Sequence, residues 1–91
     1  MKITMVKKIL ADGSPCKKCA EVEQRLTAGQ LMEKIDDIVI ADERDPESPG
    51  MQLAREYQVE RAPFFIVEED GIPPRIYTVY FKLVKEVLET T

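Results

Sequence analysis

Hydrophobic positions along the chain alternate between the spacing of a buried strand and the spacing of an amphipathic helix. Residues 3–10 are apolar on both parities, which is typical of a strand buried on both faces of a sheet. Ser14-Pro15 then resembles a helix-capping residue followed by proline at the first helical position. The helix predicted from there buries Cys19, Val22 and Leu26, which are spaced i, i+3 and i+7.

The end of this helix is open to two interpretations. Thr27 and Gln30 resemble a capping box, which predicts a second short helix carrying Leu31, Met32 and Ile35. A single kinked helix explains the same residues equally well.

The middle of the chain predicts a second strand and a second helix. Residues 38–41 form a short, continuous apolar run, which indicates a further parallel strand. Ser48-Pro49 repeats the cap-then-proline pattern and begins a helix whose apolar positions are Met51, Ala54 and Tyr57.

The last third predicts a hairpin and a closing helix. Residues 64–67 are strand-like, and Asp70-Gly71 is a turn signal that Pro73-Pro74 extends. Residues 75–80 form the next predicted strand. The closing helix is expected to bury Phe81, Val84 and Leu88 and to turn Lys82, Lys85, Glu86 and Glu89 to water.

This order, β-α-β-α-β-β-α, predicts an α/β fold with a four-stranded mixed sheet and helices on both faces. The first strand is expected at the centre, in a right-handed parallel pair with the second, and the Asp70-Gly71 hairpin adds antiparallel strands. A chain of 91 residues has room for one hydrophobic core, so residues 1–91 are expected to form a single domain.

Composition and charge argue against several classes of protein. Hydrophobic residues make up 44% of the chain, which is too apolar for a disordered protein. The net charge of −4 disfavours nucleic-acid binding, since phosphate contacts call for a basic surface. No apolar run approaches the roughly 20 residues of a membrane span, and the N-terminus lacks the pattern of a signal peptide. We therefore expect a cytoplasmic protein that binds neither membrane nor nucleic acid.

Cys16 and Cys19 are the only cysteines, and they form the motif Cys16-Lys17-Lys18-Cys19. Histidine is absent, which excludes Cys-His catalytic pairs and histidine metal ligands. A structural zinc site takes four Cys or His ligands, and one chain offers two. A disulfide closing so small a loop restrains the unfolded chain little. Redox chemistry is favoured, while metal or cluster binding and a passive pair remain open.

The motif is predicted at the carboxyl end of the first strand, where sites of open α/β sheets lie. With Ser14 as the cap, Cys16 would occupy the first helical turn, where free backbone N–H groups favour a thiolate. Cys16 is then the attacking nucleophile and Cys19, one turn further on, the resolving thiol. Lys17 and Lys18 add positive charge beside the site, although solvated lysines explain them as well.

At most one of Lys7 and Lys8 is expected to face the site, because consecutive strand residues point to opposite faces.

The order of elements and the Cys16–Cys19 motif at the first strand-to-helix junction resemble the thioredoxin/glutaredoxin superfamily. Residues 59–63, Val-Glu-Arg-Ala-Pro before a strand ending near Gly71, add to the resemblance. It implies a thioredoxin-like fold and a cis peptide bond before Pro63, with Ala62 and Pro63 contacting an extended substrate. It also implies a dithiol–disulfide oxidoreductase without a cofactor, acting as a monomer on a protein disulfide and restored by an unidentified reductant.

The chain departs from the best-known subgroups at several positions. Pro15 stands where thioredoxins have tryptophan, and Lys17-Lys18 replaces their Gly-Pro pair. Leu10 stands where they carry a buried aspartate, and residues 77–80 lack the Gly-Gly with which glutaredoxins bind glutathione. The chain is thus similar to a small glutaredoxin-like protein for which glutathione is not indicated as the specific reductant.

Two other functions compete with exchange. In the first, two chains each lend Cys16 and Cys19 to a four-thiolate metal or iron–sulfur site. In the second, the fold is an adaptor that binds a partner near Pro63, and the cysteines are incidental.

Overall fold

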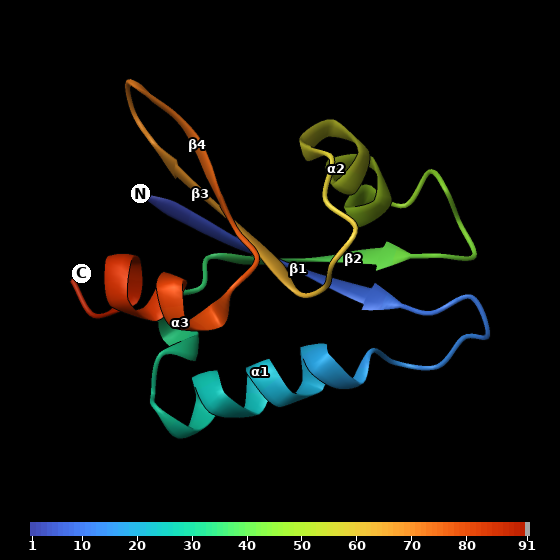
Figure 1. Ribbon diagram of the computed structural model, residues 1–91, viewed down its shortest axis with the longest axis horizontal. Helices are drawn as coiled ribbons and strands as arrows, with labels where there is room; N and C mark the ends of the chain where they lie inside the picture. The colour runs from blue at the N-terminus through green and yellow to red at the C-terminus, as the bar shows by residue number, and fades with distance from the viewer. Residues whose placement is uncertain (91) are drawn as a thin grey trace.

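The computed structural model describes residues 1–90 and contains one four-stranded mixed sheet (Figure 1). Its strands lie in the order β2-β1-β3-β4, with β1 parallel to β2 and antiparallel to β3, and β3 antiparallel to β4. The predicted α/β class and the central position of the first strand are confirmed. The elements are β1 (Lys2–Ile9), α1 (Lys17–Ala28), the 3₁₀ turn η1 (Met32–Lys34), β2 (Asp37–Asp42), α2 (Pro49–Tyr57), β3 (Phe64–Glu69), β4 (Ile72–Tyr77), α3 (Tyr80–Leu83) and the π-helix η2 (Val84–Leu88).

Helices cover both faces of the sheet, as the sequence predicts (Figure 1). Because side chains alternate along a strand, Met5 and Val6 of β1 belong to opposite cores. Met5 packs in the cluster that includes Val22 and Leu26 of α1 and buried residues of α3 and η2. Val6 packs in the other cluster, which α2 covers. The Cys16–Cys19 segment therefore follows a strand whose two faces both pack in a hydrophobic core.

Helix α2 begins as predicted, with Ser48 at the cap and Pro49 in the first turn. The Ser48 hydroxyl is used differently from a usual cap, because it accepts from the backbone N–H of Asp42 at 3.0 Å and makes no capping bond to its own helix. This contact ties the start of α2 to the end of β2.

Gly50 allows α2 to approach β2 closely. A Cβ atom built at Gly50 would overlap the backbone of Ile40 and Ala41, which cannot move aside as a flexible side chain can. We expect Gly50→Ala to lower the free energy of unfolding by about 1–3 kcal/mol, the usual range for overpacking. Urea unfolding followed by circular dichroism measures this. Gly29→Ala, at the end of α1 where φ is −85°, is the matched control, and an equal loss in both variants would contradict the close-approach argument.

The interpretation of a second helix after α1 is correct only in part. A turn separates α1 from η1, and Gln30 adopts a positive φ of 58°, so Thr27 caps no new α-helix. As the hydrophobic pattern predicts, the core cluster that contains Met5 and α1 is also contacted by Leu31, Met32 and Ile35.

The prediction for the hairpin was wrong about its prolines. Pro73 and Pro74 lie inside β4, which spans Ile72–Tyr77 rather than residues 75–80. The strand tolerates them because β4 is an edge strand, where one missing N–H donor can face solvent, and because the β3–β4 register is irregular between Val67 and Glu69, opposite the prolines.

The predicted stripe of the closing helix was wrong at Phe81, which is 67% exposed. Leu88 is buried as predicted, and Val84 packs partly buried against the same core. Leu83 and Val87, which were not predicted, are buried as well. The helix widens into the π-helix η2 from Val84 onward, which changes the spacing at which side chains return to one face.

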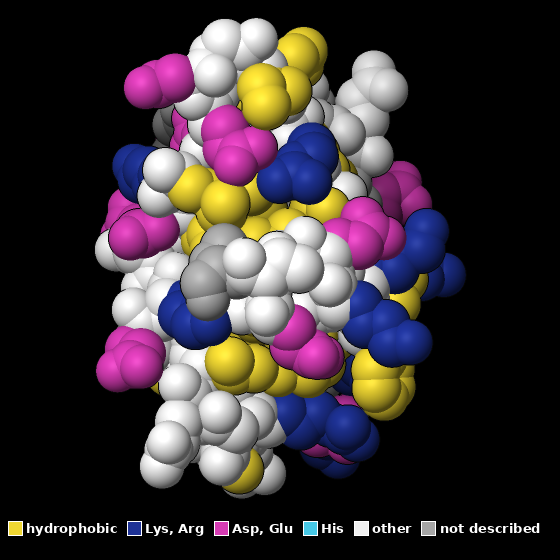
Figure 2. Space-filling model, turned by 90° about the vertical axis from the view of Figure 1, so that its left-hand side faces the viewer, with side chains coloured by type: hydrophobic (Ala, Val, Ile, Leu, Met, Phe, Trp, Pro, Cys, Tyr) yellow, Lys and Arg dark blue, Asp and Glu magenta, His cyan; other side chains and the backbone are white. Residues whose placement is uncertain are grey.

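The end of the molecule that carries both termini presents acidic and basic side chains interspersed with hydrophobic ones (Figures 1 and 2). Among residues 1–90, no helix is long and apolar enough to cross a membrane.

Candidate functional site

Cys16 is the capping residue of α1 and not, as predicted, part of its first turn. The helix begins at Lys17, and Cys16 has an extended backbone, with φ −74° and ψ 120°. Its Sγ accepts a hydrogen bond from the backbone N–H of Cys19 at 3.2 Å. The sulfur thus takes the position that a serine or aspartate oxygen takes in other helices.

Ser14-Pro15 forms part of the preceding loop, which explains the shift. The Ser14 hydroxyl and backbone N–H both donate to the Asp12 carboxylate, at 2.6 and 2.9 Å. These bonds hold the pKa of the Asp12 carboxyl below its usual value. Pro15 makes an isolated bridge with Ile9 of β1. Because the Ser14 side chain is occupied locally, the next side chain with a suitable acceptor, Cys16, caps the helix.

Cys19 lies on the buried side of α1, as predicted, and is 1% exposed. The backbone N–H of Lys8 donates to its Sγ at 3.5 Å. Burial, followed by the hydrogen bond with Cys16, raises the pKa of the Cys19 thiol to about 12, although the Lys8 amide and the Lys7 charge oppose the rise. Two thiols three residues apart therefore occupy opposite environments, Cys16 partly open to solvent and Cys19 enclosed.

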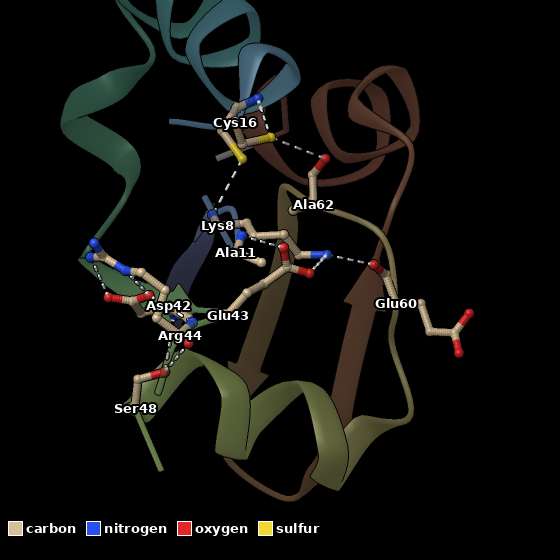
Figure 3. Close-up of polar contacts among 10 residues, drawn as sticks. Lys8, Ala11, Cys16, Asp42, Glu43, Arg44, Ser48, Glu60 and Ala62 are labelled. Atoms are coloured by element: carbon tan, nitrogen blue, oxygen red, sulfur yellow. Dashed lines mark hydrogen bonds and ion pairs between the residues drawn. The ribbon is translucent and has the colours of Figure 1, made fainter. Parts of the chain in front are cut away.

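Ala62 and Pro63 lie beside Cys16, as expected from the sequence. The Ala62–Pro63 peptide bond is cis. The Cys16 thiol donates to the Ala62 carbonyl, with 4.0 Å between Sγ and the oxygen (Figure 3). This contact joins positions that are 46 residues apart in the sequence.

Lys17 and Lys18 are exposed at the start of α1. Lys18 lines a small hollow of about 160 Å³ together with Ala62, Pro63 and Tyr80, while Lys17 does not. Within residues 1–90, neither ammonium group has a hydrogen bond or an ion pair. The structure therefore places Lys18 beside Ala62 and Pro63 and leaves Lys17 outside this hollow.

Lys7 and Lys8 extend to opposite faces, as the alternation predicts. Lys7 pairs with Glu23 of α1 at 2.6 Å. Lys8 extends to the other side, where its Nζ lies 3.5 Å from a Glu43 oxygen and donates to the Glu60 carbonyl at 3.1 Å (Figure 3). Glu43 and Glu60 were missed by the sequence analysis, because no local pattern marks contacts between loops so far apart in the chain.

A cleft of about 830 Å³ lies on the α2 side of this region. Lys8, Glu43 and Glu60 contribute to its wall, together with Met51 and Arg55 of α2. The cleft and the smaller hollow have Arg61 and Thr78 in common, so the segment before Pro63 separates two depressions.

Within the described part of the chain, no group of three or more His, Cys, Asp or Glu side chains could hold a metal ion. Comparisons with protein-family models, with curated proteins and with solved structures find no match for this chain.

Proposed function

We propose that the protein is a thiol–disulfide oxidoreductase of the thioredoxin/glutaredoxin type, which exchanges the dithiol of Cys16 and Cys19 with a protein disulfide. The observation that carries the proposal is the hydrogen bond of 3.2 Å from the Cys19 N–H to Cys16 Sγ. It places the accessible sulfur at the amino end of α1, a position typical of an attacking thiol, while the second sulfur is kept one helical turn away and buried.

In the proposed reaction, each of the two thiols carries out one of two successive attacks. The Cys16 thiolate attacks one sulfur of the substrate disulfide, forming a mixed disulfide and releasing the other sulfur as a thiolate that takes up a proton. Cys19 then attacks Cys16 Sγ, and its proton passes to the second substrate sulfur, which leaves as a thiol. The Cys16–Cys19 disulfide forms, the substrate gains two electrons, and an external thiol reductant restores the dithiol.

The position of Ala62 and Pro63 supports a polypeptide as substrate. Their closeness to Cys16 would let an extended chain pair with the Ala62 backbone while its disulfide reaches Cys16 Sγ. Lys18 would line one side of such a chain. The strand order β2-β1-β3-β4, with the dithiol after β1, supports a thioredoxin-like topology. A monomer in the cytoplasm fits a dithiol kept reduced by the cellular thiol pools.

Redox titration tests this proposal. The protein is equilibrated in dithiothreitol and glutathione buffers, its thiols are trapped by alkylation, and the mass is read. We expect a single two-electron transition between Cys16–Cys19 dithiol and disulfide at about −180 to −270 mV, the range of known exchange catalysts. A protein that forms no intramolecular disulfide in any buffer would exclude the proposal.

A further inference from the structure

Lys8 contacts both halves of the candidate site. Its backbone N–H donates to Cys19 Sγ at 3.5 Å, whereas its side chain crosses to the loop before Pro63 and donates to the Glu60 carbonyl at 3.1 Å. The two contacts use different atoms, so the side chain can be changed while the contact to the thiol stays in place. Figure 3 shows the ammonium group between Glu43 and Glu60.

The loop before Pro63 has few other attachments. Within residues 1–90, residues 60–63 make two hydrogen bonds to other segments, one from Lys8 Nζ to Glu60 and one from Cys16 to Ala62. The bond to Ala62 uses the Cys16 proton as donor, and it is lost when Cys16 becomes a thiolate or forms a mixed disulfide. From then on, the Lys8 ammonium is the remaining polar attachment of this loop.

Glu43 holds the Lys8 ammonium in place. The side chains of this ion pair are 22% and 34% exposed, so both remain partly shielded from solvent. The other Glu43 oxygen accepts from the backbone N–H of Ala11 at 3.1 Å, and the Glu43 backbone N–H donates to the Ile9 carbonyl at 2.9 Å. Lys8 and Glu43 thus connect three loops at one edge of the sheet, which carry Ala11, Glu43 and Glu60.

We propose that Lys8 is a positioning residue that keeps the Ala62 backbone beside Cys16 during exchange and so favours polypeptide disulfides over small ones. This inference rests on the proposed function. A polypeptide gains from the fixed loop, because its backbone pairs with the loop only if the Ala62 N–H and C=O are already placed. A small disulfide needs access to Cys16 Sγ alone and gains little.

The test compares two substrates with each variant. Lys8→Met keeps the length of the side chain and removes the ammonium group. We expect kcat/KM for a disulfide-bonded peptide to fall about tenfold, the worth of one ordinary hydrogen bond, mostly through KM. The rate with hydroxyethyl disulfide should change less than twofold. Lys8→Arg, which can still donate to a carboxylate and a carbonyl, should recover most of the peptide activity.

Lys2→Met is the matched control, because it removes the same charge from the far end of the same strand, where the side chain is exposed. It should leave both substrates unaffected. Unchanged peptide kinetics in Lys8→Met, or an equal loss for both substrates, would overturn the positioning role.

NMR relaxation provides a readout that does not depend on activity. In Lys8→Met, the order parameters of the backbone amides of Glu60, Arg61 and Ala62 should fall, because the loop loses its attachment through the Glu60 carbonyl, while those of β1 stay unchanged. If the wild-type protein catalyses no exchange, this result still decides whether Lys8 holds the loop, so failure of the inference and failure of the proposed function remain distinguishable. Unchanged order parameters at these three amides would overturn the inference.

Discussion

Replacing Cys16 with serine is expected to reduce disulfide exchange to the uncatalysed rate. Serine keeps an acceptor at the capping position, so α1 should still begin at Lys17 and the fold should persist. The hydroxyl, however, does not form a disulfide, and the remaining thiol, Cys19, is 1% exposed and cannot reach a substrate. Reduction of insulin or of a disulfide-bonded peptide, with dithiothreitol as the electron source, measures the loss.

Cys19→Ser is the matched variant, because it changes the resolving thiol and leaves the nucleophile. It should still attack a substrate disulfide and then stop at the mixed disulfide, which mass spectrometry detects as a covalent adduct on Cys16. Full turnover by Cys16→Ser would contradict the assignment of the nucleophile. Full turnover by Cys19→Ser without a trapped adduct would contradict the role of the resolving thiol.

The arrangement of the sheet could be predicted because each sequence pattern that indicates it lies within one short stretch of the chain. An apolar run on both parities, as in residues 3–10, implies helices on both faces, and β1 indeed contributes Met5 and Val6 to two separate cores. The cap-then-proline pattern at Ser48 succeeded for the same reason, since the residues that begin α2 are adjacent in the chain.

The same pattern predicted the wrong start for α1 at Ser14, because the Ser14 side chain makes a different hydrogen bond. Asp12 lies two residues earlier and takes both the hydroxyl and the backbone N–H of Ser14, so α1 starts later and Cys16 becomes the cap. This displacement changes the chemistry, since it makes the Cys16 sulfur a direct acceptor for a helical N–H. The motif spacing identified the two candidate thiols, and the loop determines which hydrogen bonds the first one makes.

The contacts of Lys8 could not have been found from the sequence. Glu43 and Glu60 are 35 and 52 positions away along the chain, and charged loop residues are common enough that no pairing stands out. The exposure of Phe81 in the closing helix was missed for a different reason. The wider turn of η2 breaks the 3.6-residue period on which the prediction for Phe81 depended.

The buried thiol of Cys19 is expected to make the reduced protein less stable in alkali. Its pKa is raised to about 12 in the folded state, mainly by burial, whereas an exposed thiol in the unfolded chain has the ordinary value of 9.0. Between these values the unfolded chain has lost the proton and the folded protein still holds it. The contribution is fully present below pH 9 and is lost as the pH rises toward 12.

Urea unfolding of the reduced protein at pH 8.0, 9.5 and 10.5 measures this effect. Above pH 9, the free energy of unfolding should fall by up to about 1.4 kcal/mol per pH unit through Cys19. Cys19→Ala lacks this group, so the difference between wild type and Cys19→Ala removes the titration of lysines and tyrosines common to both. Cys16→Ser should keep most of the dependence, because burial is the first cause of the shift and remains in that variant. A pH dependence that is the same in wild type and Cys19→Ala would mean that Cys19 ionises as easily when folded as when unfolded, and the contrast between an accessible thiol and an enclosed, protonated one would not hold.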